Sequence, residues 1–253
     1  MSKTKIIVAN WKMNPESAEE AKKISFDIKE SGNDFDKIKL IICPPFVFLN
    51  EIQTIFARSK KIFVGAQDVF AGQGVSHTGE VNAIMLKNSG MKYVIVGHSE
   101  KRAAGDDEMI VKKKLESVLD SGLHAIFCIG EKNRDEHGVQ FNEVKGQIES
   151  ALLKIPKKII SKLIVAYEPV WAIGKSENEA MKPEQLHEMT IFIKKVLSDI
   201  FGFENAEKVP ILYGGSVTKG NAKEIVEKGN VDGLLIGRES LKTKNFIELI
   251  KEI

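Results

Sequence analysis

Eight short apolar segments recur along the chain, and each is nearly continuous in valine, isoleucine and leucine. Strands covered on both faces have such unbroken runs, whereas strands with one solvated face alternate apolar and polar residues. The pattern therefore predicts eight buried parallel strands. The segments are KIIVAN (5–10), KLIICPP (39–45), IFVGAQ (62–67), YVIVGH (93–98), HAIFCIG (124–130), LIVAYEP (163–169), VPILYGG (209–215) and DGLLIG (232–237).

The segments between these runs have the apolar spacing of helices. Residues 15–30, 106–122 and 183–197 are the clearest, with acidic first turns and with Pro15 and Pro183 at the expected first helical positions. Eight strand–helix units in 253 residues favour a closed eight-stranded parallel (β/α)8 barrel over an open doubly wound sheet, whose Gly-rich dinucleotide turn the sequence lacks. No linker divides the chain, so we expect a single barrel domain over residues 1–253.

Composition excludes several functions. The 37 Lys and Arg residues nearly balance the 35 Asp and Glu residues, which gives no reason to expect nucleic acid or an anionic membrane as a partner. The basic run KKK at 112–114 is typical of a solvated helix face. Cys43 and Cys128 lie in apolar runs, so we expect buried reduced thiols instead of a disulfide framework or a metal site. With no apolar signal core or membrane-length run, we expect a soluble cytoplasmic protein.

Reactive side chains follow the expected strands. In a closed barrel the carboxyl ends of all strands meet at one mouth, where catalytic groups are found. A carboxylate, an imidazole, an ammonium and an amide would therefore converge there, which makes a candidate active site. In chain order these strand ends contain Asn10, Lys12, Gln67, His98, Ser99, Glu100, Gly130, Glu131, Glu168, Gly214, Gly215, Ser216 and Gly237.

Each of the main candidates has an ordinary alternative. Glu168 could begin a helix, His98 could be a satisfied core or turn histidine, and Lys12 could be a surface lysine. Pro169 argues against the first alternative, because it restricts the preceding residue to extended backbone. His98 precedes SEKR, where a helix is expected to begin and amide dipoles disfavour a charged ring. Lys12 stands between two large apolar residues that are costly to expose.

Glycine turns follow the last three strands. YGGSV follows the seventh run, IGR the eighth, and AIG the sixth. Backbone amides of such turns can together bind a phosphate, and the last strands of a barrel are a common phosphate site.

The sequence resembles the triosephosphate isomerase family in eight blocks that occur in the family's order. The resemblance implies a TIM barrel that interconverts dihydroxyacetone phosphate and D-glyceraldehyde 3-phosphate in glycolysis and gluconeogenesis, with no metal or organic cofactor. The blocks are NWKMN (10–14), GAQDV (65–69), SHTGE (76–80), VGHSEKR (96–102), CIGE (128–131), AYEPVWAIG (166–174), YGGSVT (213–218) and IGRESLK (236–242).

The resemblance also implies a role for each catalytic residue. Glu168 is the base that moves a proton between the two carbons beside the carbonyl, and neutral His98 donates to the carbonyl oxygen. Asn10 and Lys12 stabilise the charge of the enediolate intermediate, a task for which fixed polar groups are better suited than mobile water. Glu100, within VGHSEKR, belongs to the same catalytic set.

The substrate phosphate has its own implied contacts. Gly174 approaches it from a lid that follows Glu168, while Ser216, Gly237 and Arg238 contribute amides from the barrel. An enediolate phosphate exposed to water can expel its phosphate, so the lid should close over it, with Pro169 stiffening the hinge.

Two positions depart from the family pattern. The lid usually reads AIGTGKTA, but this chain has AIGKSENEA, in which Lys175, Ser176, Glu177 and Asn178 replace the usual tip. Arg238 follows Gly237 where the family usually has two adjacent glycines. We expect the lid to close with altered kinetics and the amide of residue 238 to be retained.

The segment FAGQGVSHTGE (70–80) is longer than an ordinary strand–helix connection. It could be a flexible surface loop. In the family this loop inserts into a second subunit, and Thr78, Gly79 and Glu80 match the inserted tip. The resemblance therefore implies a homodimer formed through the 70–80 loop.

Two other functions are weighed against the isomerase. A phosphate-binding aldolase would use Lys12 as a Schiff base, and a non-catalytic sugar-phosphate sensor would keep the fold with an impaired lid. The sensor is supported only by the two departures. Asn10, Lys12, His98 and Glu168 are all present, which favours the enzyme.

Overall fold

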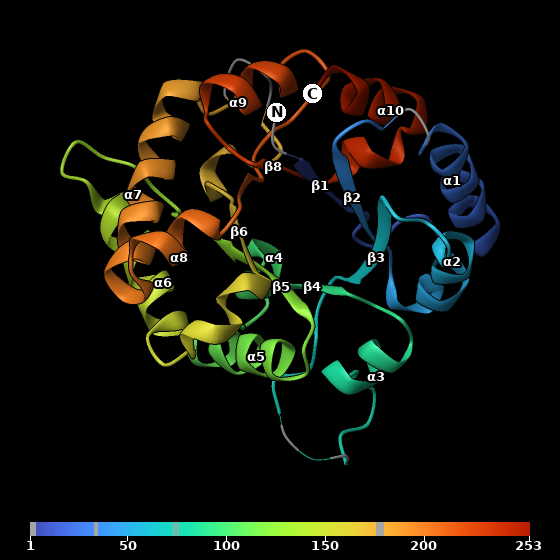
Figure 1. The fold of residues 1–253 in the computed structure, drawn as a ribbon, viewed down its shortest axis with the longest axis horizontal. Coiled ribbons are helices and arrows are strands. Elements are labelled where there is room, and N and C mark those ends of the chain that lie inside the picture. The colour runs from blue at the N-terminus through green and yellow to red at the C-terminus, as the bar shows by residue number, and fades with distance from the viewer. Residues whose placement is uncertain (1–3, 33–34, 73, 75, 176–179) are drawn as a thin grey trace.

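Eight parallel strands form a closed barrel in a computed structural model of the chain, which describes residues 4–32, 35–72, 74, 76–175 and 180–253 (Figure 1). The strands pair in chain order, and the last closes the ring against the first. The predicted (β/α)8 TIM barrel is therefore confirmed. The strands are β1 (Lys5–Asn10), β2 (Ile38–Cys43), β3 (Ile62–Ala66), β4 (Tyr93–Val96), β5 (His124–Ile129), β6 (Leu163–Tyr167), β7 (Ile211–Tyr213) and β8 (Gly233–Ile236).

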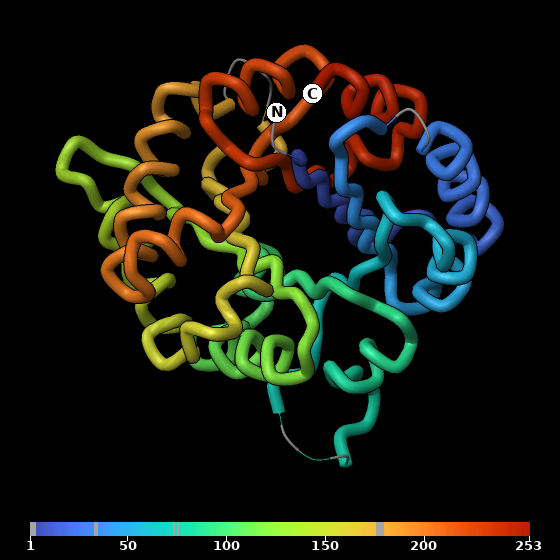
Figure 2. The backbone as a smooth tube through the Cα atoms, in the orientation of Figure 1, coloured from blue at the N-terminus to red at the C-terminus, as the bar shows by residue number. Residues whose placement is uncertain are grey.

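Helices surround the barrel on its outer face (Figures 1 and 2). In the described part of the chain, none of them is both long and apolar enough to cross a membrane. The α-helices are α1 (Ala18–Ser31), α2 (Leu49–Phe56), α3 (Ala83–Asn88), α4 (Ser99–Ala103), α5 (Glu108–Asp120), α6 (Val139–Leu152), α7 (Pro183–Phe201), α8 (Phe203–Lys208), α9 (Ala222–Lys228) and α10 (Thr243–Glu252). Short 3-10 helices are η2 (Phe46–Phe48), η3 (Lys157–Lys162), η4 (Val170–Ala172) and η6 (Arg238–Leu241).

The two prolines expected at helix starts behave differently. Pro183 is the first residue of α7, as predicted. The prediction for Pro15 is wrong, because α1 begins three residues later at Ala18. Ser17 is the N-cap of α1, and its hydroxyl accepts a hydrogen bond from the amide of Glu20. A side chain that accepts from a free amide of the first turn sets the start of this helix better than a proline can.

Side chains of the strands point alternately into the barrel and toward the helices, and this produces two apolar layers. The inner layer includes Val8, Ile41, Ile126 and Leu212, and the outer layer packs the strands against the helices. Cys43 and Cys128 both lie in the inner layer as free, buried thiols, as expected. Burial raises the pKa of each thiol, so both stay protonated near neutral pH.

The basic run at 112–114 does not lie entirely on a solvated face. Lys114 is buried, and its ammonium lies 2.7 Å from Asp68 Oδ1 and 2.6 Å from Asp106 Oδ2. The expectation of a solvated face is therefore wrong for Lys114, because two carboxylates from other segments compensate its charge. Asp68 also pairs with Lys101 on α4 at 2.8 Å, so this group of charges joins the end of β3 to the helices that follow β4.

We expect Leu212→Ala to lower the free energy of unfolding by about 2–5 kcal/mol, because Leu212 is fully buried inside the barrel and its truncation leaves a cavity. Urea denaturation followed by circular dichroism measures the loss. The matched control is Leu153→Ala, since Leu153 is 63% exposed and its truncation should change stability by no more than about 0.5 kcal/mol. Equal losses in the two variants would contradict the layered core.

Candidate active site

A cavity of about 200 Å³ lies at the carboxyl ends of the strands. It is formed by segments that follow β1, β4, β6, β7 and β8, which lie far apart in the sequence. Of the nine residues to which the resemblance assigns a catalytic or substrate-binding role, Asn10 and Glu100 do not line it. Those that do are Lys12, His98, Glu168, Gly174, Ser216, Gly237 and Arg238.

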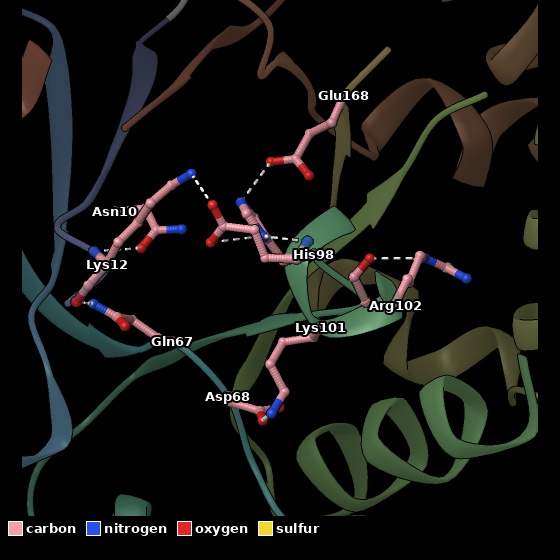
Figure 3. Close-up of polar contacts among 10 residues, drawn as sticks. Asn10, Lys12, Gln67, Asp68, His98, Lys101, Arg102 and Glu168 are labelled. Atoms are coloured by element: carbon pink, nitrogen blue, oxygen red, sulfur yellow. Dashed lines mark hydrogen bonds and ion pairs between the residues drawn. The ribbon is translucent and has the colours of Figure 1, made fainter. Parts of the chain in front are cut away.

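His98 and Glu168 both line this cavity, and their side chains point toward one another (Figure 3). His98 Nε2 lies 3.5 Å from Glu168 Oε1, and the two residues are 6% and 2% exposed. His98 is also the N-cap of α4, where its Nδ1 accepts a hydrogen bond of 3.2 Å from the amide of Glu100. Because Nδ1 is an acceptor, a neutral ring has its proton on Nε2, the atom directed at the cavity.

The carboxylate of Glu168 is held in place through its backbone. The Glu168 amide donates to the carbonyl oxygen of Ile129 at 2.7 Å. Pro169 separates Glu168 from η4, so Glu168 does not begin a helix. Among the described residues neither of its carboxylate oxygens has a hydrogen-bond partner, although both are buried. A buried carboxylate without partners is costly, and it is available to a ligand in the cavity.

The Cys128 thiol lies beside this carboxylate on the inner face of the barrel. Its pKa is raised well above the ordinary range, first by burial and second by the negative charge of Glu168. The thiol is therefore a neutral neighbour of Glu168.

Lys12 has an unusual backbone that its neighbours stabilise. Its φ of 54° lies in the left-handed region, which is uncommon for a residue other than glycine. The Lys12 amide donates to Asn10 Oδ1 at 3.1 Å, and Gln67 Nε2 donates to the Lys12 carbonyl at 2.9 Å and to the Cys43 carbonyl at 2.8 Å. These bonds, drawn in part in Figure 3, hold the backbone of Lys12, whose side chain lines the cavity and pairs with Glu100 outside the lining.

Gln67 was present among the expected strand ends without an assigned role. The sequence could have suggested a supporting role for Gln67, because it directly follows β3 and a side-chain amide there can reach the ends of the neighbouring strands. Asn10 and Gln67 thus act on the backbone of Lys12, and they lie behind it instead of in the cavity wall.

The end of the cavity near β7 and β8 contains the remaining candidates. The Ser216 hydroxyl lies 2.9 Å from the carbonyl oxygens of Ala172 and Lys175, so it contacts the segment that follows Glu168. Gly174 has a left-handed φ of 71°, and a methyl group added to it would lie 3.5 Å from Arg238 Nη2. The Arg238 guanidinium thus lies directly beside Gly174. Of the expected lid, Ser176, Glu177 and Asn178 fall outside the described residues.

Glu131 forms a second buried carboxylate group near the first. It accepts hydrogen bonds of 2.9 Å from the Tyr167 hydroxyl and from the Trp171 indole, which belong to the segments before and after Glu168. Burial raises the pKa of Glu131, and the bond from Trp171 is the largest effect that opposes the shift. Sequence analysis placed Glu131 at a strand end but missed its two partners. The sequence could have suggested that Glu131 has such partners, because a carboxylate directly after a buried strand requires them.

No group of three or more His, Cys, Asp or Glu side chains is arranged to hold a metal ion in the parts of the chain that the structure describes. The cavity instead combines a carboxylate, an imidazole and an ammonium with glycine-rich turns at the ends of β7 and β8. This arrangement on this fold defines the class of protein: a (β/α)8-barrel enzyme with an acid–base site beside a potential anion site.

Comparison with known proteins identifies the family. The sequence profile described as triosephosphate isomerase matches residues 5–253. The triosephosphate isomerase of Idiomarina loihiensis is 38% identical over 252 residues, which cover 98% of each chain. That of Flavobacterium psychrophilum is 40% identical over 255 residues, covering 99% of this chain and 100% of the relative. That of Dictyoglomus turgidum is 36% identical over 249 residues, or 98% of each chain.

The chain belongs to the triosephosphate isomerase family. It is an isomerase that interconverts triose phosphates, an activity of glycolysis.

We expect Tyr167→Phe to destabilise the protein by about 1–3 kcal/mol at neutral pH, because it removes a hydrogen bond to the buried Glu131 carboxylate. The loss should shrink as the pH falls. Burial raises the folded-state pKa of Glu131 above its unfolded-state pKa. The contribution of Glu131 to the free energy of unfolding is therefore fully present below the unfolded-state pKa, and it is lost as the pH rises through the folded-state pKa. Without the hydrogen bond from Tyr167, the folded-state pKa of Glu131 rises further, so stability declines more as the pH rises.

Urea denaturation of both proteins at a series of pH values measures this difference. Tyr93→Phe is the matched control, since the Tyr93 hydroxyl has no hydrogen bond to another described residue and the pKa of Tyr93 is raised by burial alone. A pH-independent loss in Tyr167→Phe would contradict the assigned interaction.

Proposed function

We propose that this triose-phosphate isomerase uses Glu168 as its base and neutral His98 as its hydrogen-bond donor. The Glu168 carboxylate removes a proton from the carbon beside the carbonyl, while His98 Nε2–H donates to the carbonyl oxygen. The proton then returns to the neighbouring carbon, and the enediolate collapses to the other triose phosphate. The observation that carries the proposal is the approach of His98 Nε2 to a buried Glu168 carboxylate without partners, within one cavity.

The other catalytic residues stabilise the negative charge that develops on the substrate oxygens. The Lys12 ammonium lies at the cavity wall, and Asn10 holds the Lys12 backbone amide. Glu100 binds the Lys12 ammonium, and its amide keeps His98 Nδ1 occupied as an acceptor. Groups fixed in this way need little rearrangement as charge develops, which is the basis of electrostatic catalysis.

The phosphate of the substrate binds at the opposite end of the cavity. Gly174 from the lid and Ser216, Gly237 and Arg238 from the barrel supply its contacts, since all four line this end. The segment after Glu168 closes over the intermediate and excludes water, which prevents loss of phosphate from the enediolate. The contact of the Ser216 hydroxyl with the carbonyls of Ala172 and Lys175 supports a closed position for this segment.

We expect Glu168→Gln to abolish turnover, with a fall in kcat of at least about 10²- to 10⁴-fold, because an amide cannot accept the carbon-bound proton. Binding of a phosphate ligand should be largely retained, since the phosphate contacts lie at the other end of the cavity. A coupled assay of triose-phosphate interconversion measures the rate, and inhibition by inorganic phosphate measures binding. A near-normal rate would refute the assignment of Glu168 as base.

We also propose that the chain forms a homodimer through the 70–80 loop. The described residues of this loop lie outside the ring of helices, where they can reach a second subunit (Figure 2). Two large apolar side chains that follow β1 and β2 are highly exposed, namely Met13 at 89% and Val47 at 79%. Exposed apolar surface at the same end of the barrel as the active site favours coverage by a partner.

Dilution tests the homodimer. Sedimentation velocity should give twice the mass of the 28.1 kDa chain, and specific activity should fall once the protein is diluted below the dimer dissociation constant. A monomer that retains full activity at high dilution would contradict the proposal.

Two further inferences accompany this function. We infer that residues 1–253 form one domain, which is supported by the pairing of β8 with β1 at opposite ends of the chain. We also infer a cytoplasmic location, which is supported by the glycolytic activity and by the two free buried cysteines.

A further inference from the structure

Gln147 on α6 holds both backbone groups of Gly130, the residue directly after β5. Its Oε1 accepts from the Gly130 amide at 2.8 Å, and its Nε2 donates to the Gly130 carbonyl at 3.0 Å. Gln147 is only 7% exposed, so these bonds lie away from water. A side-chain amide that satisfies both polar groups of one residue fixes the position of that residue along the strand and across it.

The other edge of the same short segment, residues 129–131, is hydrogen-bonded to the backbone around the proposed base, Glu168. The Glu168 amide donates to the carbonyl of Ile129 at 2.7 Å, and the Val170 amide donates to the carbonyl of Glu131 at 2.9 Å. Gly130 therefore lies between two backbone hydrogen bonds. One of them holds the base, and the other holds the first residue of η4, where the lid segment begins.

Gly130 also packs directly against the peptide that follows the base. A Cβ atom at residue 130 would lie 1.9 Å from the Glu168 carbonyl oxygen, so only glycine permits this approach. Gly214, the residue directly after β7, packs against the side chain of Glu168, where a Cβ atom would lie 2.6 Å from Glu168 Cγ. Glu168 is thus confined between two glycines, and a displacement of Gly130 is transmitted to it by direct contact.

The position of Gln147 on its helix argues for more than packing. Val144, Ile148 and Ala151 are buried on the same face of α6, so an apolar residue would suit position 147 if the helix only had to cover the barrel. Placing an amide there costs free energy that its two hydrogen bonds offset. The consequence is that an outer helix determines the backbone position at the active-site end of β5.

We propose that Gln147 is a positioning residue for the isomerisation: by holding Gly130 it sets the position of the Glu168 carboxylate relative to His98 and the substrate. Gln147 is outside the cavity lining and acts only through Gly130. The proposal rests on the role of Glu168 as base. Displacement of a catalytic group by even about 1 Å can lower a rate on the order of 100-fold, so a modest shift of Gly130 is sufficient.

The test compares Gln147→Met with Gln140→Met. Methionine has a similar length but cannot replace either hydrogen bond of Gln147. Gln140 is the matched control, because it lies on the same helix, is also buried, and accepts a hydrogen bond from the Asp135 amide instead of binding Gly130. We expect kcat of Gln147→Met to fall about 10- to 100-fold, while its KM and inhibition by inorganic phosphate stay within about twofold, since phosphate contacts are untouched. Gln140→Met should keep the native kcat within about twofold.

Gln147→Glu provides a second variant that keeps one of the two hydrogen bonds, because its carboxyl group still accepts from the Gly130 amide while a carboxylate cannot donate to the Gly130 carbonyl. It should also lower kcat with little change in KM, and it replaces the methionine variant if that variant does not fold. Combining Gln147→Met with Glu168→Gln should add no further loss to Glu168→Gln alone, because both changes act on the same step.

Four outcomes would overturn the proposal: an unchanged kcat in folded Gln147→Met, an equal fall in Gln140→Met, a rise in KM that matches the fall in kcat, or failure of both Gln147 variants to fold. The last result would show that the amide is needed for folding itself. A high rate in Glu168→Gln would instead refute the proposed base, whatever the Gln147 variants do, so the two failures are distinguishable.

Discussion

The site depends on a buried carboxylate whose nearest polar neighbours are the His98 ring and the Cys128 thiol. Glu168 is 2% exposed, and its two oxygens have no hydrogen-bond partner among the described residues. Removing such a group from water costs free energy that the folded chain recovers elsewhere, chiefly in the two apolar layers of the barrel. The cost is tolerated because the backbone around Glu168 leaves it little freedom to turn toward solvent. The result is a carboxylate held 3.5 Å from the Nε2 atom of His98, in the geometry that the proposed acid–base roles require.

Comparison with Glu131 clarifies what distinguishes the two buried carboxylates. Glu131 lies close by in the fold and is fully buried, yet it receives hydrogen bonds from the Tyr167 hydroxyl and the Trp171 indole. Its interactions are satisfied within the protein, so it connects the segments on either side of Glu168 instead of facing a ligand. Burial with strong donors thus gives Glu131 a structural position, whereas Glu168 keeps its oxygens directed at the cavity, as the proposed role requires.

Lys12 combines a side chain that lines the cavity with a backbone that residues outside the cavity hold in place. Its ammonium lines the cavity, while its left-handed backbone is held by Asn10 on one side and Gln67 on the other. Gln147 would act on the base in a corresponding way through Gly130. Side-chain amides outside the cavity wall therefore recur as the means by which this barrel fixes strand ends. They suit the task because one amide both donates and accepts without carrying a charge.

The eight strands, the barrel and the chemical types at its mouth were predictable from the residues alone, because buried parallel strands have unbroken apolar runs and Pro169 marks where the sixth must end. The sequence also placed Glu168, His98 and Lys12 at strand ends. Three pairings could be seen only in the folded chain: Lys114 is buried between two aspartates, Glu131 binds Tyr167 and Trp171, and Gln147 reaches Gly130. Those pairings join residues distant in the chain, so their geometry follows from strand register and helix packing, which local patterns do not specify.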